Sequence, residues 1–347
     1  MKVTVLMSVW NGERFVAEAV ESVLAQTFGD FEFLIVDDAS TDSTPAILAA
    51  YRDARVRILR NDENLGLTKS LNRGLREARG EYVARLDADD VCLPRRLELQ
   101  SSFLNANPNV AVVGGQAHFI GENGRRRLGD RTPRSARAAK FALMFSSPLI
   151  HSAAMFRRSV VVDELHGYDE EFVTSQDVDL WSRISARHEL RNLDAYVLRH
   201  RVHRGSISAT RYTYRNVSRV QYVLHRAVMA STGDPALADA WPFVWGAVVN
   251  MAVFENTGGS DEAGELARAL YEKAVARDPL LARDPDVNAL YATVQMRIGA
   301  FQAGCGKAGA PQALARAFRV APRVVFRRLP GMGVAYARRV VQEVRRG

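Results

Sequence analysis

Apolar stretches and amphipathic stretches alternate through the first 120 residues of the chain. Short, largely apolar runs predict strands at residues 2–8, 31–36, 56–59, 81–86 and 110–120. Apolar side chains that recur at helical spacing predict helices at residues 13–26, 46–52, 68–78 and 94–105. Short buried strands that alternate with helices are typical of an α/β fold. We therefore predict a mostly parallel, Rossmann-like sheet with helices on both of its faces.

The pattern changes after about residue 208, where helical spacing predominates. Glycine and proline interrupt this region at residues 233–235, 258–259, 284–285 and 304–311. A chain of 347 residues is long enough for two structural units. We predict an α/β domain over residues 1–208, followed by a helical C-terminal region over residues 209–347.

The positive charge of the chain is concentrated in residues 315–347. This segment holds nine arginines and one glutamate, and 9 − 1 = +8 equals the net charge of the whole chain. A nucleic-acid-binding protein usually carries its charge on the recognition domain, so we expect no nucleic-acid partner. Apolar residues interleave with the arginines, a pattern that favours contact with an anionic membrane surface. The alternative is that the segment packs on the rest of the protein and its arginines are solvated.

No stretch of the sequence is predicted to span a membrane. The uncharged stretch at residues 240–254 contains Pro242 and Asn250 and falls short of the about 20 apolar residues that a spanning helix needs, so it predicts a core helix. Cys92 and Cys305 form neither a disulfide framework nor a metal-ligand cluster, and we expect Cys92 to be a buried thiol. These features favour a reducing compartment. We predict a cytoplasmic protein that associates with the inner face of the membrane through residues 315–347.

Polar clusters follow three of the predicted strands, at residues 8–12, 37–42 and 87–90. Ligands of parallel sheets bind beyond the carboxyl ends of the strands, so these clusters predict a single site. Asp87 and Asp89 share one face of their strand, because alternate residues of a strand point to the same side. Their carboxylate oxygens suit Mg²⁺ or Mn²⁺. The alternative is that these acids are solvated and cap the next helix.

Short sequence blocks surround these strand ends and continue downstream. They occupy residues 5–12, 34–42, 64–66, 72–74, 80–82, 86–90, 151–158, 167–170, 176–181 and 201–208. In composition and in order, over residues 2–208, the blocks resemble the inverting glycosyltransferases of family 2. The resemblance implies a nucleotide-diphospho-sugar transferase sheet that transfers a sugar from a nucleoside-diphosphate donor, with UDP-sugar favoured, to an acceptor hydroxyl. It further implies cell-surface polysaccharide or glycoconjugate synthesis on a glycan or lipid-linked acceptor.

The resemblance implies that the strand ends hold the donor. Asp38 would accept a hydrogen bond from the nucleobase, and Trp10 can stack on the base. Ser8 and Trp10 stand where the family usually has Pro and Tyr, a departure that affects donor preference. The other residues implied in donor binding are Asn11, Asn64, Lys69, Asp87 and Ala88. Lys69 and Arg85 are charges near this edge that either contact phosphate or are solvated.

The resemblance also implies a metal site and a catalytic base. Asp89 would bind Mn²⁺ or Mg²⁺, and His203 would join it from the last strand as a neutral imidazole. Asp177 would be the general base that takes the proton of the acceptor hydroxyl, while that oxygen attacks and inverts the anomeric carbon. Gln176 stands where relatives commonly have Glu. The alternatives are that Asp177 and Asp179 only cap a helix, and that His203 is a surface histidine.

Several other functions lack their motifs in this sequence. Processive synthases of the wider family carry a Gln/Arg-x-x-Arg-Trp block, which is absent, so we expect one sugar per encounter. A nucleotidyltransferase would need a glycine-rich loop near the N-terminus, and a dinucleotide oxidoreductase a Gly-x-Gly-x-x-Gly motif, whereas residues 8–14 contain only Gly12. A catalytically inactive sugar- or membrane-surface-binding protein on the same scaffold would lack Asp89 or Asp177, and both are present.

Overall fold

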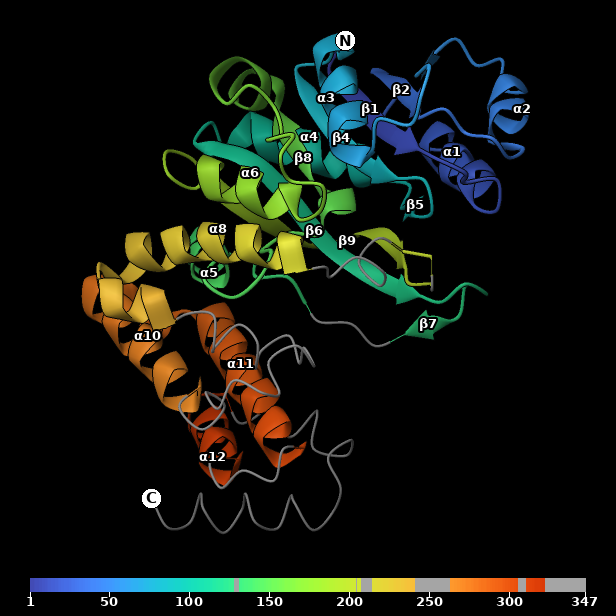
Figure 1. The fold of residues 1–347 in the computed structure, drawn as a ribbon. Coiled ribbons are helices and arrows are strands. Elements are labelled where there is room, and N and C mark those ends of the chain that lie inside the picture. Colours follow the sequence, from blue (N-terminus) through green and yellow to red (C-terminus); the bar gives the residue numbers. More distant parts are fainter. Residues whose placement is uncertain (128–130, 204, 207–213, 241–262, 305–309, 322–347) are drawn as a thin grey trace. The chain divides into compact units, whose positions relative to one another are not determined.

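The computed structural model describes residues 1–127, 131–203, 205–206, 214–240, 263–304 and 310–321 (Figure 1). The chain divides into two compact units. The first unit holds Met1–Ala136 and Ser147–Val220, and the second holds Arg137–Ser146 and Gln221–Gly347. The predicted boundary at residue 208 lies outside the described residues and stays a prediction, and the same is true of residues 241–254 of the predicted core helix.

Four parallel strands form one half of the sheet in the first unit. These strands are β1 (Val3–Val9), β2 (Phe31–Asp37), β3 (Val56–Arg60) and β4 (Tyr82–Asp87), in the order β3-β2-β1-β4. The pairing register sets Ser8 of β1 beside Asp87 of β4, and Val9 beside Asp37 of β2. The four predicted strands are therefore confirmed, and the polar ends of β1, β2 and β4 meet at one edge of the sheet.

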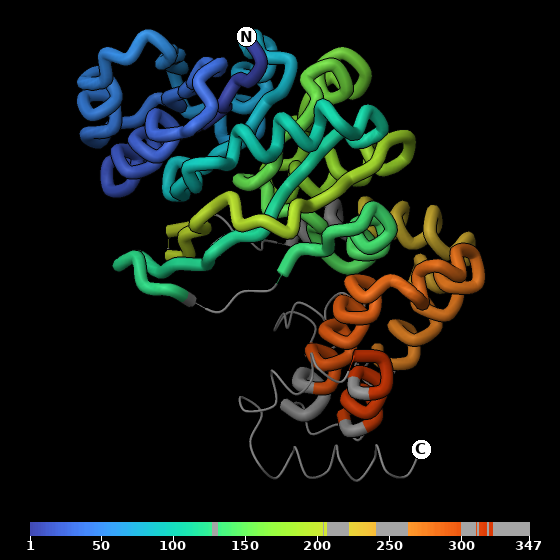
Figure 2. Tube along the Cα trace, turned by 180° about the vertical axis from the view of Figure 1, so that it is seen from behind, coloured from blue at the N-terminus to red at the C-terminus, as the bar shows by residue number. Residues whose placement is uncertain are grey.

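The other half of the sheet is mixed. It contains β5 (Val91–Cys92), β6 (Val110–Ile120), β7 (Arg126–Arg127), β8 (Met155–Arg157) and β9 (Glu189–Arg201). The short strand β8 runs antiparallel to β4 and β6 and joins the two halves. Strand β9 runs parallel to β6, and the two lie side by side when the molecule is seen from behind (Figure 2). Polar residues on the half-exposed face of β9 interrupt its apolar pattern, and we did not predict this strand from the sequence.

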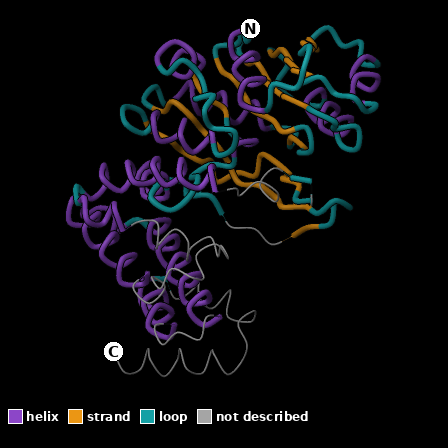
Figure 3. The backbone as a smooth tube through the Cα atoms, viewed as in Figure 1, coloured by secondary structure: helices purple, strands orange, loops and turns teal. Residues whose placement is uncertain are grey.

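Helices pack on both faces of the sheet and are separated by loops (Figure 3). Those of the first unit are α1 (Val16–Leu24), α2 (Thr44–Ala49), α3 (Leu67–Glu77), α4 (Arg96–Ala106) and α6 (Gln176–Ile184), with short turns η1 (His151–Ala153) and η2 (Ser159–Glu164). Helix α3 packs on β1 and β2, whereas α4 packs on β6 and β9. The predicted Rossmann-like α/β fold is confirmed, with a mixed sheet.

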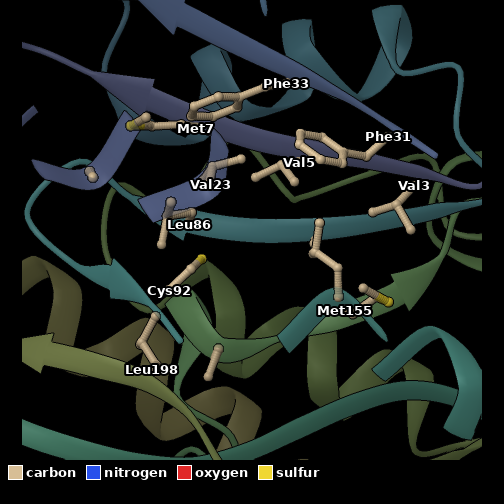
Figure 4. Close-up of a cluster of buried hydrophobic side chains, with 14 of the residues drawn as sticks. Val3, Val5, Met7, Val23, Phe31, Phe33, Leu86, Cys92, Met155 and Leu198 are labelled. Carbon is tan, nitrogen blue, oxygen red and sulfur yellow. The ribbon is translucent and has the colours of Figure 1, made fainter. Parts of the chain in front are cut away.

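The core of the first unit forms where β1 and β2 meet α1 and β5 (Figure 4). The buried face of α1 consists of Val16, Ala19, Val20 and Val23, spaced at one helical turn. Complete burial of one such valine contributes about 1.5–3 kcal/mol. Cys92 lies in this cluster as a free, buried thiol, as predicted, and Cys305 lies outside the described residues.

The second unit is helical, as predicted. It holds α5 (Ala136–Ala142) from Arg137 on and α8 (Tyr214–Thr232) from Gln221 on. Its other elements are α10 (Ala263–Arg277), η4 (Pro279–Arg283), α11 (Pro285–Gly304) and α12 (Ala310–Val320). Helices α11 and α12 pack closely, because Gly299 of α11 has no side chain and leaves room for the backbone of Ala310. None of the described helices combines the length and the apolar composition that crossing a membrane requires.

Candidate active site

The loops after β1 and β2 are tied together at the edge where their strands end. The side-chain oxygen of Asn11 accepts a hydrogen bond from the backbone N–H of Thr41 at 2.8 Å, and the N–H of Asn11 donates to Ser40 Oγ at 3.0 Å. Asn11 has a positive φ of 50°, a conformation that asparagine tolerates better than most residues. Asp37 accepts from the backbone N–H of Ser40 and so shapes this turn. These hydrogen bonds connect the two loops.

Asp38 is almost fully buried, and internal donors surround its carboxylate. Its Oδ1 accepts from Asn61 Nδ2 at 2.6 Å and from the N–H of Leu65 at 2.9 Å, while Oδ2 accepts from the N–H of Gly66 at 2.9 Å. A carboxylate has about four acceptor positions. Oδ1 is therefore saturated, and Oδ2 retains one position for a ligand.

The remaining predicted donor residues differ in exposure. Trp10 leaves 53% of its surface exposed although it follows a buried strand, and Ser8 inside β1 is buried. Asn64 and Lys69 are exposed, and Ala88 is half-buried. Exposure of a large aromatic ring beside a polar strand end suits stacking with a planar ligand.

Asp87 forms an ion pair with Arg85, which precedes it by two positions on β4. Arg85 Nη2 lies 2.5 Å from Asp87 Oδ1, and the Asp87 backbone N–H donates to Ser152 Oγ at 2.9 Å. Burial opposes ionisation of Asp87, but the neighbouring positive charge, above all that of Arg85, outweighs it and lowers the pKa of Asp87. Arg85 itself is buried, so the alternative that it is a solvated charge is wrong.

Asp90 is fully buried and is bound to β9. Its Oδ2 lies 3.0 Å from His200 Nδ1, and its Oδ1 accepts from the backbone N–H of Arg201 at 2.7 Å. Burial disfavours the charged imidazole, but the Asp90 carboxylate overcomes this effect and raises the pKa of His200 to about 9. Asp90 and His200 therefore form a structural ion pair that joins the end of β4 to β9.

Asp89 and His203, separated by 114 positions in sequence, meet at this edge. Asp89 Oδ2 and His203 Nε2 are 2.8 Å apart, and the His203 ring packs against Phe15. Burial raises the pKa of Asp89 to about 6, and the charges of Asp87 and Asp90 act in the same direction. His203 is half-buried, and Asp89 satisfies one of its ring nitrogens.

These side chains fit a divalent cation. Carboxylate oxygens of Asp87, Asp89 and Asp90 lie within 4.8 Å of one another. The 2.8 Å between the Asp89 oxygen and the His203 nitrogen is close to the separation of about 3 Å between adjacent ligands of an octahedral ion with bonds of 2.0–2.1 Å. Carboxylate oxygen and imidazole nitrogen are donors that Mn²⁺ accepts, and carboxylate oxygen also suits Mg²⁺.

Asp177 and Asp179 both lie in the first turn of α6 but have different partners. Asp179 is buried and forms an ion pair with Arg183 at 2.7 Å. Asp177 lies 3.3 Å from Ser147 Oγ and has no ion-pair partner in the part of the chain that the structure describes. Burial raises the pKa of Asp177 to about 6, although hydrogen bonds from Val178 and Ser147 partly offset this effect. Asp177 can therefore exchange a proton near neutral pH.

The segment before α6 carries a neutral histidine. His151 Nε2 lies 2.8 Å from the Tyr168 hydroxyl. Burial, assisted by the charge of Arg85, lowers the pKa of His151 to about 3, so the imidazole is uncharged. Burial raises the pKa of Tyr168, so its hydroxyl stays protonated. The two side chains thus form a neutral hydrogen-bonded pair.

Sequence reasoning missed His200, Ser147 and Ser152. Each acts on a predicted residue through a contact 30 or more positions away in sequence. His200 gave a weak signal, because it stands three positions before His203 in a strand that reaches the same edge. The two serines gave none, since their role depends on the fold.

Comparisons with known proteins place the chain among the glycosyltransferases. Residues 4–165 match the profile of glycosyl transferase family 2. EpsE of Bacillus subtilis is 38% identical over 189 residues, which are 52% of this chain and 66% of that protein. An uncharacterized glycosyltransferase of Methanocaldococcus jannaschii is 32% identical over 206 residues (58% and 70%). The amylovoran biosynthesis glycosyltransferase AmsE of Erwinia amylovora is 29% identical over 235 residues (66% and 87%).

Solved structures show the same fold. TarS from S. aureus, solved in complex with UDP-GlcNAc, superposes with a TM-score of 0.60 over 88% of this chain and 93% of that chain, at 19% identity. A mannosyltransferase from Pyrobaculum calidifontis, solved with GDP-Man and Mn²⁺, gives 0.52 over 91% and 85%, at 18% identity. The chain belongs to glycosyltransferase family 2.

Proposed function

We propose that this glycosyltransferase moves a sugar from a nucleoside-diphosphate donor to an acceptor hydroxyl with inversion at the anomeric carbon. The observation that carries the proposal is that Asp89 and Asp177 lie in the same structural unit. Asp89 lies beside His203 at the strand edge. Asp177 is half-buried, has no ion-pair partner among the described residues, and is close enough to this edge that the charge of Asp87 helps to raise its pKa. Asp89 would help to stabilise the leaving diphosphate, and Asp177 would accept the proton of the attacking hydroxyl.

In the proposed reaction Asp177 acts as the general base. Its carboxylate accepts the proton of the acceptor hydroxyl while that oxygen forms a bond to the anomeric carbon, and the bond from this carbon to the diphosphate breaks on the opposite face. A divalent cation, Mn²⁺ or Mg²⁺, held by Asp89 and His203 would neutralise the charge that develops on the diphosphate. The acidic cluster and the Mn²⁺ in the Pyrobaculum calidifontis neighbour support a cation.

We infer that the donor carries uracil, because Asp38 can accept only one more hydrogen bond. Uracil presents a single imide N–H, which the free position on Oδ2 can accept. Guanine presents two adjacent N–H donors, which would need both carboxylate oxygens, and Oδ1 is already saturated by Asn61 and Leu65. The exposed ring of Trp10 would stack on the base.

We further propose a glycan or lipid-linked acceptor in the synthesis of a cell-surface polysaccharide or glycoconjugate. The relative named for amylovoran biosynthesis supports this assignment. The arginine-rich segment at residues 315–347 would bring the enzyme to the inner face of an anionic membrane. Residues 322–347 of this segment lie outside the described residues.

A thermal-shift comparison of donors tests the proposal, because a ligand that binds the folded state raises the melting temperature. With Mn²⁺ present, we expect UDP-sugars to raise the melting temperature and GDP-sugars to raise it much less. A hundredfold excess of donor over its Kd corresponds to about 2.7 kcal/mol of stabilisation. Asp89→Ala should lose the Mn²⁺-dependent part of the shift and the transfer activity.

The matched control is Asp30→Ala, which removes an exposed acid before β2, at the opposite edge of the sheet. It should keep the full shift. Equal shifts with UDP- and GDP-sugars would contradict the assignment of uracil. Turnover of Asp89→Ala at the normal rate in the presence of a chelator would contradict the role of the cation.

A further inference from the structure

Arg85 is a fully buried arginine in the middle of the sheet. A guanidinium cannot lose its proton in a protein, so its burial requires compensation by a negative charge. Nη2 of Arg85 lies 2.5 Å from Asp87 Oδ1, and Nη1 donates to the carbonyl of Leu86. Nε has no hydrogen-bond partner among the described residues. Asp87 therefore supplies the negative charge for Arg85.

This pairing occupies one of the three acids at the strand edge, and a second is occupied as well. Both oxygens of Asp90 are bound, one to His200 and one to the backbone of Arg201. Asp89 is the remaining acid, and its side chain contacts His203. Two of the three carboxylates are thus already paired with a cationic side chain of the protein, Asp87 with Arg85 and Asp90 with His200.

We propose that Arg85 is a positioning residue that withdraws Asp87 from the divalent cation and leaves Asp89 with His203 as the metal-binding pair. This inference rests on the proposed cation. The geometry of β4 explains why Arg85 and Asp87 pair. Residues two positions apart on a strand point to the same side, so the two side chains meet without any movement of a loop. The free protein should then bind the cation weakly, and the donor diphosphate should supply the missing negative charge.

If Arg85 has this role, its replacement by an uncharged residue should raise the affinity for the metal and not lower it. Removal of a buried positive charge beside the acids should strengthen cation binding, both through lost repulsion and through release of Asp87 as a ligand. A residue that only supports the fold would, when replaced, weaken binding or leave it unchanged. Mn²⁺ binding by the free protein therefore separates the two roles.

The test measures Mn²⁺ binding to the free protein by the loss of the electron paramagnetic resonance signal of free Mn²⁺. We expect Arg85→Met to raise the affinity by about tenfold, and Arg85→Lys, which keeps the charge, to stay within about twofold of the parent protein. The matched control is Arg57→Met. Arg57 also pairs with a buried acid, Glu32, but it lies on β3, three strands away from β4.

Unchanged or weaker Mn²⁺ binding by folded Arg85→Met would overturn the inference. If that variant does not fold, Asp87→Asn decides, since its amide oxygen can still accept from Arg85. Asp87→Asn should weaken Mn²⁺ binding by the free protein through the lost negative charge, but much less than Asp89→Asn, which also removes a metal ligand, whereas a loss as large as that of Asp89→Asn would overturn the inference. Absence of Mn²⁺ binding by the parent protein, even with UDP present, would instead contradict the proposed cation itself.

Discussion

At the scale of single residues, the first turn of α6 shows how the surroundings assign different roles to the same side chain. Asp177 and Asp179 stand two positions apart, and a helix directs such residues to different sides. Arg183, one turn further along, pairs with Asp179 and also donates to the carbonyls of Leu165 and Gly167. Asp179 therefore holds the preceding segment, while the carboxylate of Asp177 keeps its capacity to accept a proton.

We predict that Asp177→Asn lowers kcat by about 10²–10⁴-fold and leaves donor affinity nearly unchanged, because the amide has the same shape but is not a base. In the parent enzyme burial raises the pKa of Asp177 to about 6. A general base acts when it has lost its proton. The rate kcat/KM should therefore rise with pH through about 6 and then level off, and steady-state kinetics over pH would show this limb.

The matched control for this prediction is Asp179→Asn. It breaks the buried pair with Arg183 and should lower stability, but the rise of kcat/KM near pH 6 should persist. An Asp177→Asn enzyme with normal kcat, or with equal losses in kcat and donor affinity, would assign Asp177 a structural role.

At the scale of elements, α3 holds the segment that leads into α6. The Asn72 side chain accepts from the backbone N–H of Tyr168 and donates to its carbonyl, both at 2.8 Å, and it also donates to Glu170. Thr68, one turn earlier, donates to the carbonyl of Phe172 at 2.6 Å. Gly167 has a φ of 84°, and a side chain there would collide with Asn72. These contacts fix the segment between the neutral His151–Tyr168 pair and Asp177.

We predict that Asn72→Ala destabilises the first unit by about 2–6 kcal/mol, since it leaves two buried backbone groups of Tyr168 without partners at about 1–3 kcal/mol each. Urea unfolding would measure the loss. Asn105→Ala is the control, because among the described residues the exposed Asn105 side chain of α4 accepts one hydrogen bond, from Tyr82. It should cost less than about 1 kcal/mol. Equal losses from the two variants would contradict the role given to α3.

At the scale of the whole molecule, the arginine-rich segment is divided by the fold. Its first part lies in α12, where Ala315 and Ala317 are buried and Arg316 pairs with Glu265 of α10. For residues 315–320 this supports the alternative that the segment packs on the protein. Seven arginines and Glu343 follow in residues 322–347, a balance of 7 − 1 = +6. The membrane proposal therefore concerns residues 322–347.

We predict that the full chain sediments with anionic liposomes at low salt, and that a chain ending at Ala321 does not. Each basic residue near such a surface contributes about 1 kcal/mol, and salt screens the attraction. Ending at Ala321 retains α12 and so leaves the packing of the helical unit intact. The full chain with neutral liposomes is the control. Negligible sedimentation of both chains on anionic lipid would refute membrane association.

The sequence alone determined the strands of the parallel half, the helices between them and the helical C-terminal region. Local periodicity specifies these elements, because a buried strand needs a run of apolar residues and a helix needs an apolar stripe at its own spacing. The sequence also placed Asp89 at a strand end, and the motif resemblance led to the family. Strand β9 was missed, since its half-exposed face carries polar residues that interrupt the apolar pattern.

Only the tertiary structure decided which polar groups pair. Sequence spacing cannot show that His203 meets Asp89, that His200 binds Asp90, or that Arg85 is buried against Asp87. The pKa of a carboxylate depends on burial and on charges a few ångströms away, and most of those charges come from distant parts of the chain. Hydrophobic periodicity depends on neighbouring residues and can be read along the chain. The electrostatic environment of a side chain depends on which groups the fold brings near it, so it is defined only once the chain has folded.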